Sequence, residues 1–164
     1  MRAILDHPPV PPTVYGEITL CFAQDFPVES LDSIIGLTAS RSQSLHDTRI
    51  NPVTKQHNPG YWSYRTKAQS AKEFDCTPLF DSLAELISTH EAGLRQTFTQ
   101  YGPYDFIVRI YIDVQEQGEY PAIAFPPLFL KQLSELAATL EVIVTDCYER
   151  SGEERTATLL SGEE

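Results

Sequence analysis

The stretch from Asp105 to Gln115 constrains the fold more than any other part of the sequence. Its apolar residues at positions 106, 108, 110, 112 and 114 alternate with Ile107, Arg109, Tyr111 and Asp113. A period of two residues is typical of a β-strand, with one set of side chains on each face. One face of this strand therefore needs an apolar cover, which helices packed on one side of a sheet can provide.

Residues 13–22 repeat this alternation near the start of the chain. One set of side chains is apolar, and the set that alternates with it is Tyr15, Glu17, Thr19 and Cys21. β-branched, aromatic and apolar residues between turn signals predict four more strands. These strands cover residues 37–45, 61–67, 120–125 and 142–148.

Apolar residues at helical spacing predict three helices. They cover residues 26–35, 77–102 and 126–140. Thr77 is expected to be the N-cap of the second helix, with Pro78 in its first turn. The predicted element order is β-α-β-β-α-β-β-α-β. This order indicates an α+β fold, in which a mostly antiparallel sheet of about five to six strands has helices packed on one face.

The length of 164 residues fits one domain. We expect a single α+β domain over residues 13–148. It follows a proline-rich N-terminal arm, residues 1–12, and precedes an acidic C-terminal tail, residues 149–164. No apolar run approaches the ~18 residues that a membrane span needs, and no secretion signal is recognisable. We therefore expect a cytoplasmic protein without a membrane partner.

Charge is distributed unevenly along the chain. Residues 41–72 contain six basic residues and one acidic residue, a net charge of +5. The whole chain carries −11, so the remainder carries −16. Such a balance opposes attraction of the whole protein to nucleic acid and favours a basic partner for the acidic surface.

The basic segment also contains aromatic residues. Arg41, Trp62, Tyr64 and Arg65 are candidate binding residues, because aromatic rings and guanidinium groups together can stack on bases or hold anions. Two alternatives remain open. Trp62 and Tyr64, two residues apart, can share a buried strand face. The basic residues can complement the acidic surface of the protein itself.

Two further groups of polar residues are candidates for chemistry. Arg109 and Asp113 share one face of the strand at 105–115, where they can form, with Asp146, either an acid–base site or a cross-strand ion pair. His46, Asp47 and His57 are suitable metal ligands, but their spacing matches no known site. The three cysteines include no CxxC pair, and no phosphate-binding glycine loop or serine nucleophile motif occurs. We predict no metal and no cofactor.

The sequence resembles the bacterial family catalogued as domain of unknown function 4279, from about Tyr15 to Tyr148. Four segments carry the resemblance in order, which are Ser33-Ile34-Ile35-Gly36-Leu37, the stretch from Ser40-Arg41 to His46-Asp47, Tyr61-Trp62-Ser63, and Val142-Ile143-Val144-Thr145-Asp146-Cys147-Tyr148. Ala39 stands where proline is usual in this family, and His46 where glycine is usual. The resemblance implies an α+β domain of bacterial, cytoplasmic origin, and it implies no reaction.

Three hypotheses for function follow, in this order of preference. The first is a non-enzymatic protein-binding domain, in its sharpest form an immunity protein that neutralises a basic toxin. The second is a small bacterial enzyme with an unrecognised active site near Arg109, Asp113 and Asp146. The third is a phosphate or nucleic-acid binder that uses residues 41–72. Exposed edge strands also allow a homodimer.

Overall fold

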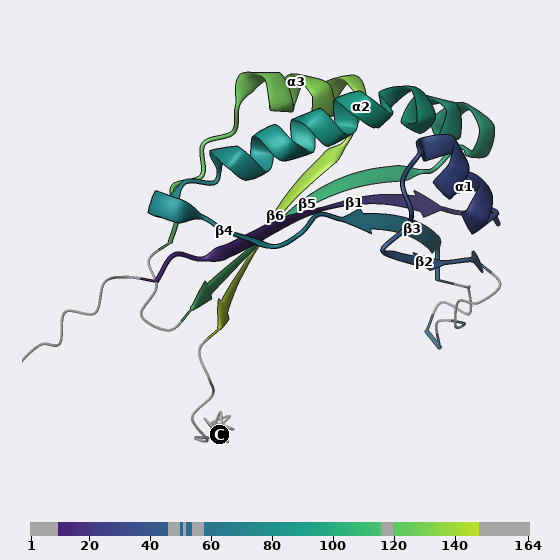
Figure 1. The fold of residues 1–164 in the computed structure, drawn as a ribbon. Helices are drawn as coiled ribbons and strands as arrows, with labels where there is room; N and C mark the ends of the chain where they lie inside the picture. The colour runs from purple at the N-terminus through teal and green to yellow at the C-terminus, as the bar shows by residue number, and fades with distance from the viewer. Residues whose placement is uncertain (1–9, 46–49, 51, 54–57, 116–119, 148–164) are drawn as a thin grey trace, which may run out of the picture.

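The computed structural model describes residues 10–45, 50, 52–53, 58–115 and 120–147. These residues form one twisted sheet with its helices gathered on one face (Figure 1). The elements are β1 (Thr13–Phe22), α1 (Val28–Ile35), β2 (Arg41–Gln43), β3 (Gly60–Arg65), β4 (Gln69–Ser70), η2 (Lys72–Phe74), α2 (Thr77–Tyr101), β5 (Asp105–Gln115), α3 (Pro127–Glu135) and β6 (Thr139–Cys147).

The strand order is β2-β3-β1-β5-β6, and the short β4 also pairs with β1. Every pairing is antiparallel except β5 with β6, which α3 connects as a parallel crossover. The central pair, β1 with β5, runs from Thr13 opposite Asp113 to Cys21 opposite Asp105. The two strands with the clearest alternation in the sequence therefore form the middle of the sheet.

The predicted α+β class and the mostly antiparallel sheet are confirmed. The strand predicted at residues 120–125 is wrong, because only an isolated bridge between Asp75 and Ala122 occurs there. Pro121 lacks a backbone donor, and β6 occupies the edge of β5 where a returning hairpin strand would pair. The strand β4, between residues 67 and 72, was not predicted.

The ends of the helices also differ from the prediction. Thr77 is the first residue of α2 rather than the N-cap. The backbone N–H of Thr77 donates a hydrogen bond of 2.9 Å to the carboxylate of Asp75. The last helix ends at Glu135, five residues before the predicted end. Ala137 adopts a positive φ of 50° and turns the chain into β6, which begins three residues earlier than expected.

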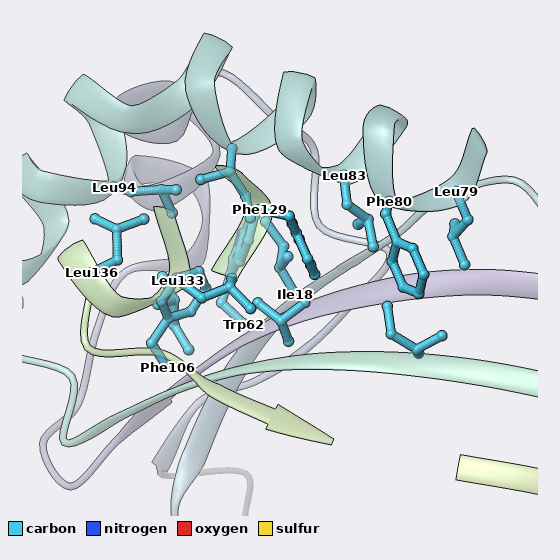
Figure 2. Close-up of a cluster of buried hydrophobic side chains, with 14 of the residues drawn as sticks. Ile18, Trp62, Leu79, Phe80, Leu83, Leu94, Phe106, Phe129, Leu133 and Leu136 are labelled. Atoms are coloured by element: carbon cyan, nitrogen blue, oxygen red, sulfur yellow. The ribbon is translucent and has the colours of Figure 1, made fainter. Parts of the chain in front are cut away.

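The core lies between the sheet and the helices. Figure 2 shows Leu79, Phe80 and Leu83 of α2 pointing toward the sheet. At Gly16 of β1 a side chain would collide with Leu83, so this glycine lets α2 approach the sheet closely. The core contains two sets of apolar side chains. One set comes from the alternating residues of β1 and β5, the other from the sheet-facing sides of the helices, and both sets are buried.

Trp62 lies in this core and is fully buried. Its Nε1 donates a hydrogen bond of 2.7 Å to Asp32 Oδ1, which also accepts the N–H of Ala39 at 3.0 Å. The carboxylate thus links α1 to β3 and to the chain that enters β2. A buried indole N–H needs such an acceptor.

No helix within the described residues is long and apolar enough to cross a membrane. The helices cover one side of the sheet, and none covers the other side in the part of the chain that the structure describes (Figure 1). We call this second side the open face.

Candidate functional site

The open face carries the polar half of each alternating strand. Tyr15, Glu17, Thr19 and Cys21 of β1 lie in its middle. Its neighbours on one side are Tyr61, Ser63 and Arg65 of β3, and on the other side Arg109, Tyr111 and Asp113 of β5. Arg41 of β2 and Glu141 of β6 extend it toward the two edges of the sheet.

Glu17 is the centre of this face and is 1 % exposed. Its Oε2 accepts hydrogen bonds from Arg41 Nη2 at 2.8 Å and from Arg65 Nη2 and Nε at 3.0 and 3.2 Å. Its Oε1 lies 3.6 Å from Arg109 Nη1 and accepts the hydroxyl of Thr19 at 3.5 Å. One buried carboxylate therefore holds three guanidinium groups from three other strands.

The electrostatics of Glu17 follow from these contacts. Burial raises the pKa of its carboxyl, but hydrogen bonds from Arg41 and Arg65 and their positive charges outweigh this effect. The pKa of Glu17 is consequently lower than usual, so the group is ionised at neutral pH. Arg109 also donates through Nε to Glu141 Oε2 at 2.6 Å. Three guanidinium groups meet two carboxylates in this cluster, and Asp113 on the same face offsets the remaining positive charge.

A pair of aromatic rings lies beside the arginines. Tyr15 and Tyr111, opposite one another in β1 and β5, stack with ring centroids 4.7 Å apart and planes inclined by 11°. The guanidinium of Arg65 lies over both rings, 4.9 Å from the Tyr15 centroid and 5.5 Å from that of Tyr111. Cation–π attraction therefore fixes Arg65 in addition to its bonds with Glu17.

A hollow of about 220 Å³ opens beside the cluster. Its lining is Glu17, Thr19, Cys21, Arg41, Pro59, Gly60, Tyr61, Ser63 and Arg109. Ser63 is only 1 % exposed, and its Oγ has no hydrogen-bond partner among the described residues. A buried hydroxyl without a partner is uncommon, and here it lies in the wall of a hollow that can admit a ligand.

A family model described as a domain of unknown function, DUF4279, matches residues 13–146. The chain belongs to this family. Neither a curated protein nor a solved structure shows a significant match to it. The matched range begins with β1 and ends within β6, so it contains every residue of the cluster around Glu17.

The DUF4279 domain brings three of the predicted binding residues together. Arg41, Arg65 and Arg109 converge on Glu17 from β2, β3 and β5. Asp113 lies on the same face, two residues beyond Tyr111. Trp62 and Tyr64 lie on the helix-facing side, buried and half-buried, as the alternative of a shared buried strand face requires.

Two residues of the predicted acid–base group, Arg109 and Asp113, are not in contact with one another. Arg109 pairs with Glu141 and Glu17, and no contact joins it to Asp113 among the described residues. Asp113 is opposite Thr145 in the sheet, whereas the position of Asp146 is opposite the buried Val114. The side chain of Asp146 lies outside the described part of the structure.

His46, Asp47 and His57, considered above as metal ligands, lie outside the described residues. Within the described part of the chain, no group of three His, Cys, Asp or Glu residues could hold a metal ion. Glu17, the residue that organises the site, was not among the predicted site residues. Its signal was present, since Glu17 is the only ionised group in the alternating strand at 13–22.

Proposed function

We propose that this DUF4279 domain is a non-enzymatic binding domain that takes up an acidic segment of a partner protein on its open face. The observation that carries the proposal is the cluster of Arg41, Arg65 and Arg109 around buried Glu17. Guanidinium groups are suited to carboxylates because their donors form a planar fork that matches the two carboxylate oxygens.

The arginines are ordered before a ligand arrives. A free arginine side chain loses rotamer entropy when it binds, whereas Glu17 already restricts these three. The side chains of Arg41 and Arg65 are nevertheless 55 % and 37 % exposed, so a ligand can reach them. The exposed edges of these guanidinium groups and the hydroxyl of Ser63 in the wall of the hollow supply donors for an anionic group.

The form of the site favours separate carboxylates over a continuous polyanion. A hollow of about 220 Å³ has room for a side chain rather than a nucleotide strand. Glu141 and Asp113 flank the arginines and would repel a phosphate backbone that crosses the face. The net charge of −11 repels a long polyanion such as nucleic acid more strongly than a short acidic segment.

The same geometry favours binding over catalysis. Both oxygens of Glu17 contact neighbouring donors, and its lowered pKa keeps it from carrying a proton at neutral pH. A general acid or base needs a pKa near the working pH and a reachable oxygen.

A second candidate partner is a basic protein, such as a toxin, on the helix layer. Exposed acidic residues cover the outer surfaces of the helices, while Arg95 and Lys131 are each engaged with an acidic residue one turn away. These acidic residues are Glu29, Asp81, Glu85 and Glu135. This acidic helix layer supports an immunity protein as the form of the binding role.

We propose that the protein is located in the cytoplasm, because Cys21 and Cys76 are free thiols.

Fluorescence polarisation with labelled ten-residue peptides tests the proposal. Peptides rich in Asp and Glu are compared with Lys- and Arg-rich peptides, a single-stranded oligonucleotide and inorganic phosphate, at low and high salt. We expect affinity for the acidic peptides that falls with salt. Arg65→Ala should weaken it about tenfold or more, since a hydrogen bond to a charged group contributes about 1.5–3 kcal/mol.

Arg95→Ala is the matched control, because Arg95 is exposed on α2 and pairs only with Glu91 among the described residues. It should leave affinity unchanged. The proposal is wrong if the folded protein binds no acidic peptide at low salt, or if the oligonucleotide binds more tightly. Tight binding of the basic peptides, weakened by Glu85→Lys, would instead support a partner on the helix layer.

A further inference from the structure

β6 ends the sheet as a long edge strand. It has nine residues and pairs only with β5 within the described part of the chain, whereas β2 at the opposite edge has three residues. An unpaired strand of this length offers a row of backbone donors and acceptors to another chain. Proteins usually block such an edge with lysine, proline or a bulge.

β6 lacks the residues that block an edge strand most strongly. Its sequence, TLEVIVTDC, contains no lysine and no proline. β6 has two charged residues, Glu141 and Asp146, and the guanidinium of Arg109 neutralises Glu141 at 2.6 Å. Asp146 lies outside positions 139–145, so the one charge within these positions is already paired within the domain.

The helix-facing side of β6 is also incompletely covered. Val142 and Val144 are 38 % and 46 % exposed, whereas Val108 and Ile110 on the same side of β5 are fully buried. Apolar side chains on an unblocked edge strand are typical of a surface that another molecule covers.

We propose that β6 pairs antiparallel with β6 of a second copy of this chain. A two-fold axis near Val142 places Leu140 opposite the partner's Val144, Thr139 opposite the partner's Thr145, and Glu141 opposite the partner's Ile143. Apolar residues then face apolar residues on the helix side, and no like charges are opposed. The strand is self-complementary, which identifies a second copy as its occupant.

The dimer joins two sheets and two open faces into one continuous surface. The two copies of Arg109, each one strand inside the interface, are three strand spacings apart across the sheet and two residues apart along it, a separation of about 16 Å. This spacing would let both sites contact one acidic chain. The dimer itself rests only on β6 and does not depend on the proposed ligand.

Sedimentation velocity of the full chain from about 10 to about 200 µM tests the dimer. We expect the wild type to reach twice the chain mass of 18.4 kDa as concentration rises. Val142→Lys combined with Val144→Lys should keep the protein monomeric throughout. Leu128→Lys, at an exposed position of α3, is the control and should leave the dimer intact.

A cross-linking experiment tests the register and does not depend on the stability of the lysine variant. Val142→Cys should give a covalent dimer under mild oxidation, because the two Val142 positions meet at the axis. Thr145→Cys should give much less. The proposal is wrong if the wild type is monomeric at about 200 µM. It is also wrong if the wild type forms a dimer that persists in the lysine variant and that Val142→Cys does not cross-link.

Discussion

Replacing Glu17 with glutamine keeps the shape of the side chain and removes the charge that orders the open face. Arg41 and Arg65 would then donate to a neutral oxygen, and Arg109 would lose one of its two carboxylate neighbours. Hydrogen bonds to charged groups contribute about 1.5–3 kcal/mol, whereas neutral ones contribute about 1 kcal/mol. Since Arg41 and Arg65 are partly exposed and can be solvated, we expect a loss of about 2 kcal/mol at pH 7.

The pH dependence of this loss follows from the lowered pKa of Glu17. A carboxyl whose pKa is lower in the folded state stabilises the protein above the unfolded-state pKa. The contribution disappears as pH falls through the folded-state pKa, where the group is protonated. The stability difference between wild type and Glu17→Gln should therefore be full at pH 7 and shrink as pH falls below the ordinary range for glutamate.

Urea unfolding at a series of pH values measures this difference. Glu91→Gln is the control, because its pair with Arg95 is an exposed helix pair, for which about 0.3–0.5 kcal/mol is expected. Equal stability of Glu17→Gln and wild type at pH 7 would show that the arginines gain nothing from the charge of Glu17. A difference that persists unchanged into acid would refute the assignment of its cause.

The two remaining predictions concern packing and the orphaned hydroxyl. Gly93→Ala should destabilise the protein by about 1–3 kcal/mol in urea unfolding, because a Cβ would collide with the main chain of Ile34; unchanged stability would mean that α1 and α2 are less closely packed than described. Ser63→Ala should leave stability unchanged or raise it by up to about 1 kcal/mol, since its Oγ has no partner among the described residues. The same variant should weaken acidic-peptide binding in the polarisation assay, and stronger binding would exclude Ser63 from ligand contact.

Local patterns predicted the elements near the centre of the sheet well. The alternation at 13–22 and 105–115 predicted two strands whose apolar sets are buried against helices. Alternation is a local property that depends on which residues face the core, so a single sequence reveals it. The prediction of a strand at 120–125 was wrong because it assigned the edge of β5 to that segment, whereas β6 pairs there.

The candidate site was predicted only in part. Arg41, Arg65 and Arg109 were recognised as binding candidates from charge and strand position, but their common partner was not. Trp62 and Tyr64 were grouped with them by sequence proximity, although neighbouring strand residues point to opposite faces. Tyr15 and Tyr111 became a stacked pair only through the register of β1 with β5.

The sequence by itself determined the α+β class, the half-buried character of the two central strands and the unequal distribution of charge. These properties depend on residue type and local period. Only the tertiary structure decided that β6 joins β5 in parallel and that Glu17 meets arginines from three other strands. Such contacts join residues 24 to 92 positions apart, and no local pattern specifies which distant strand will become a neighbour.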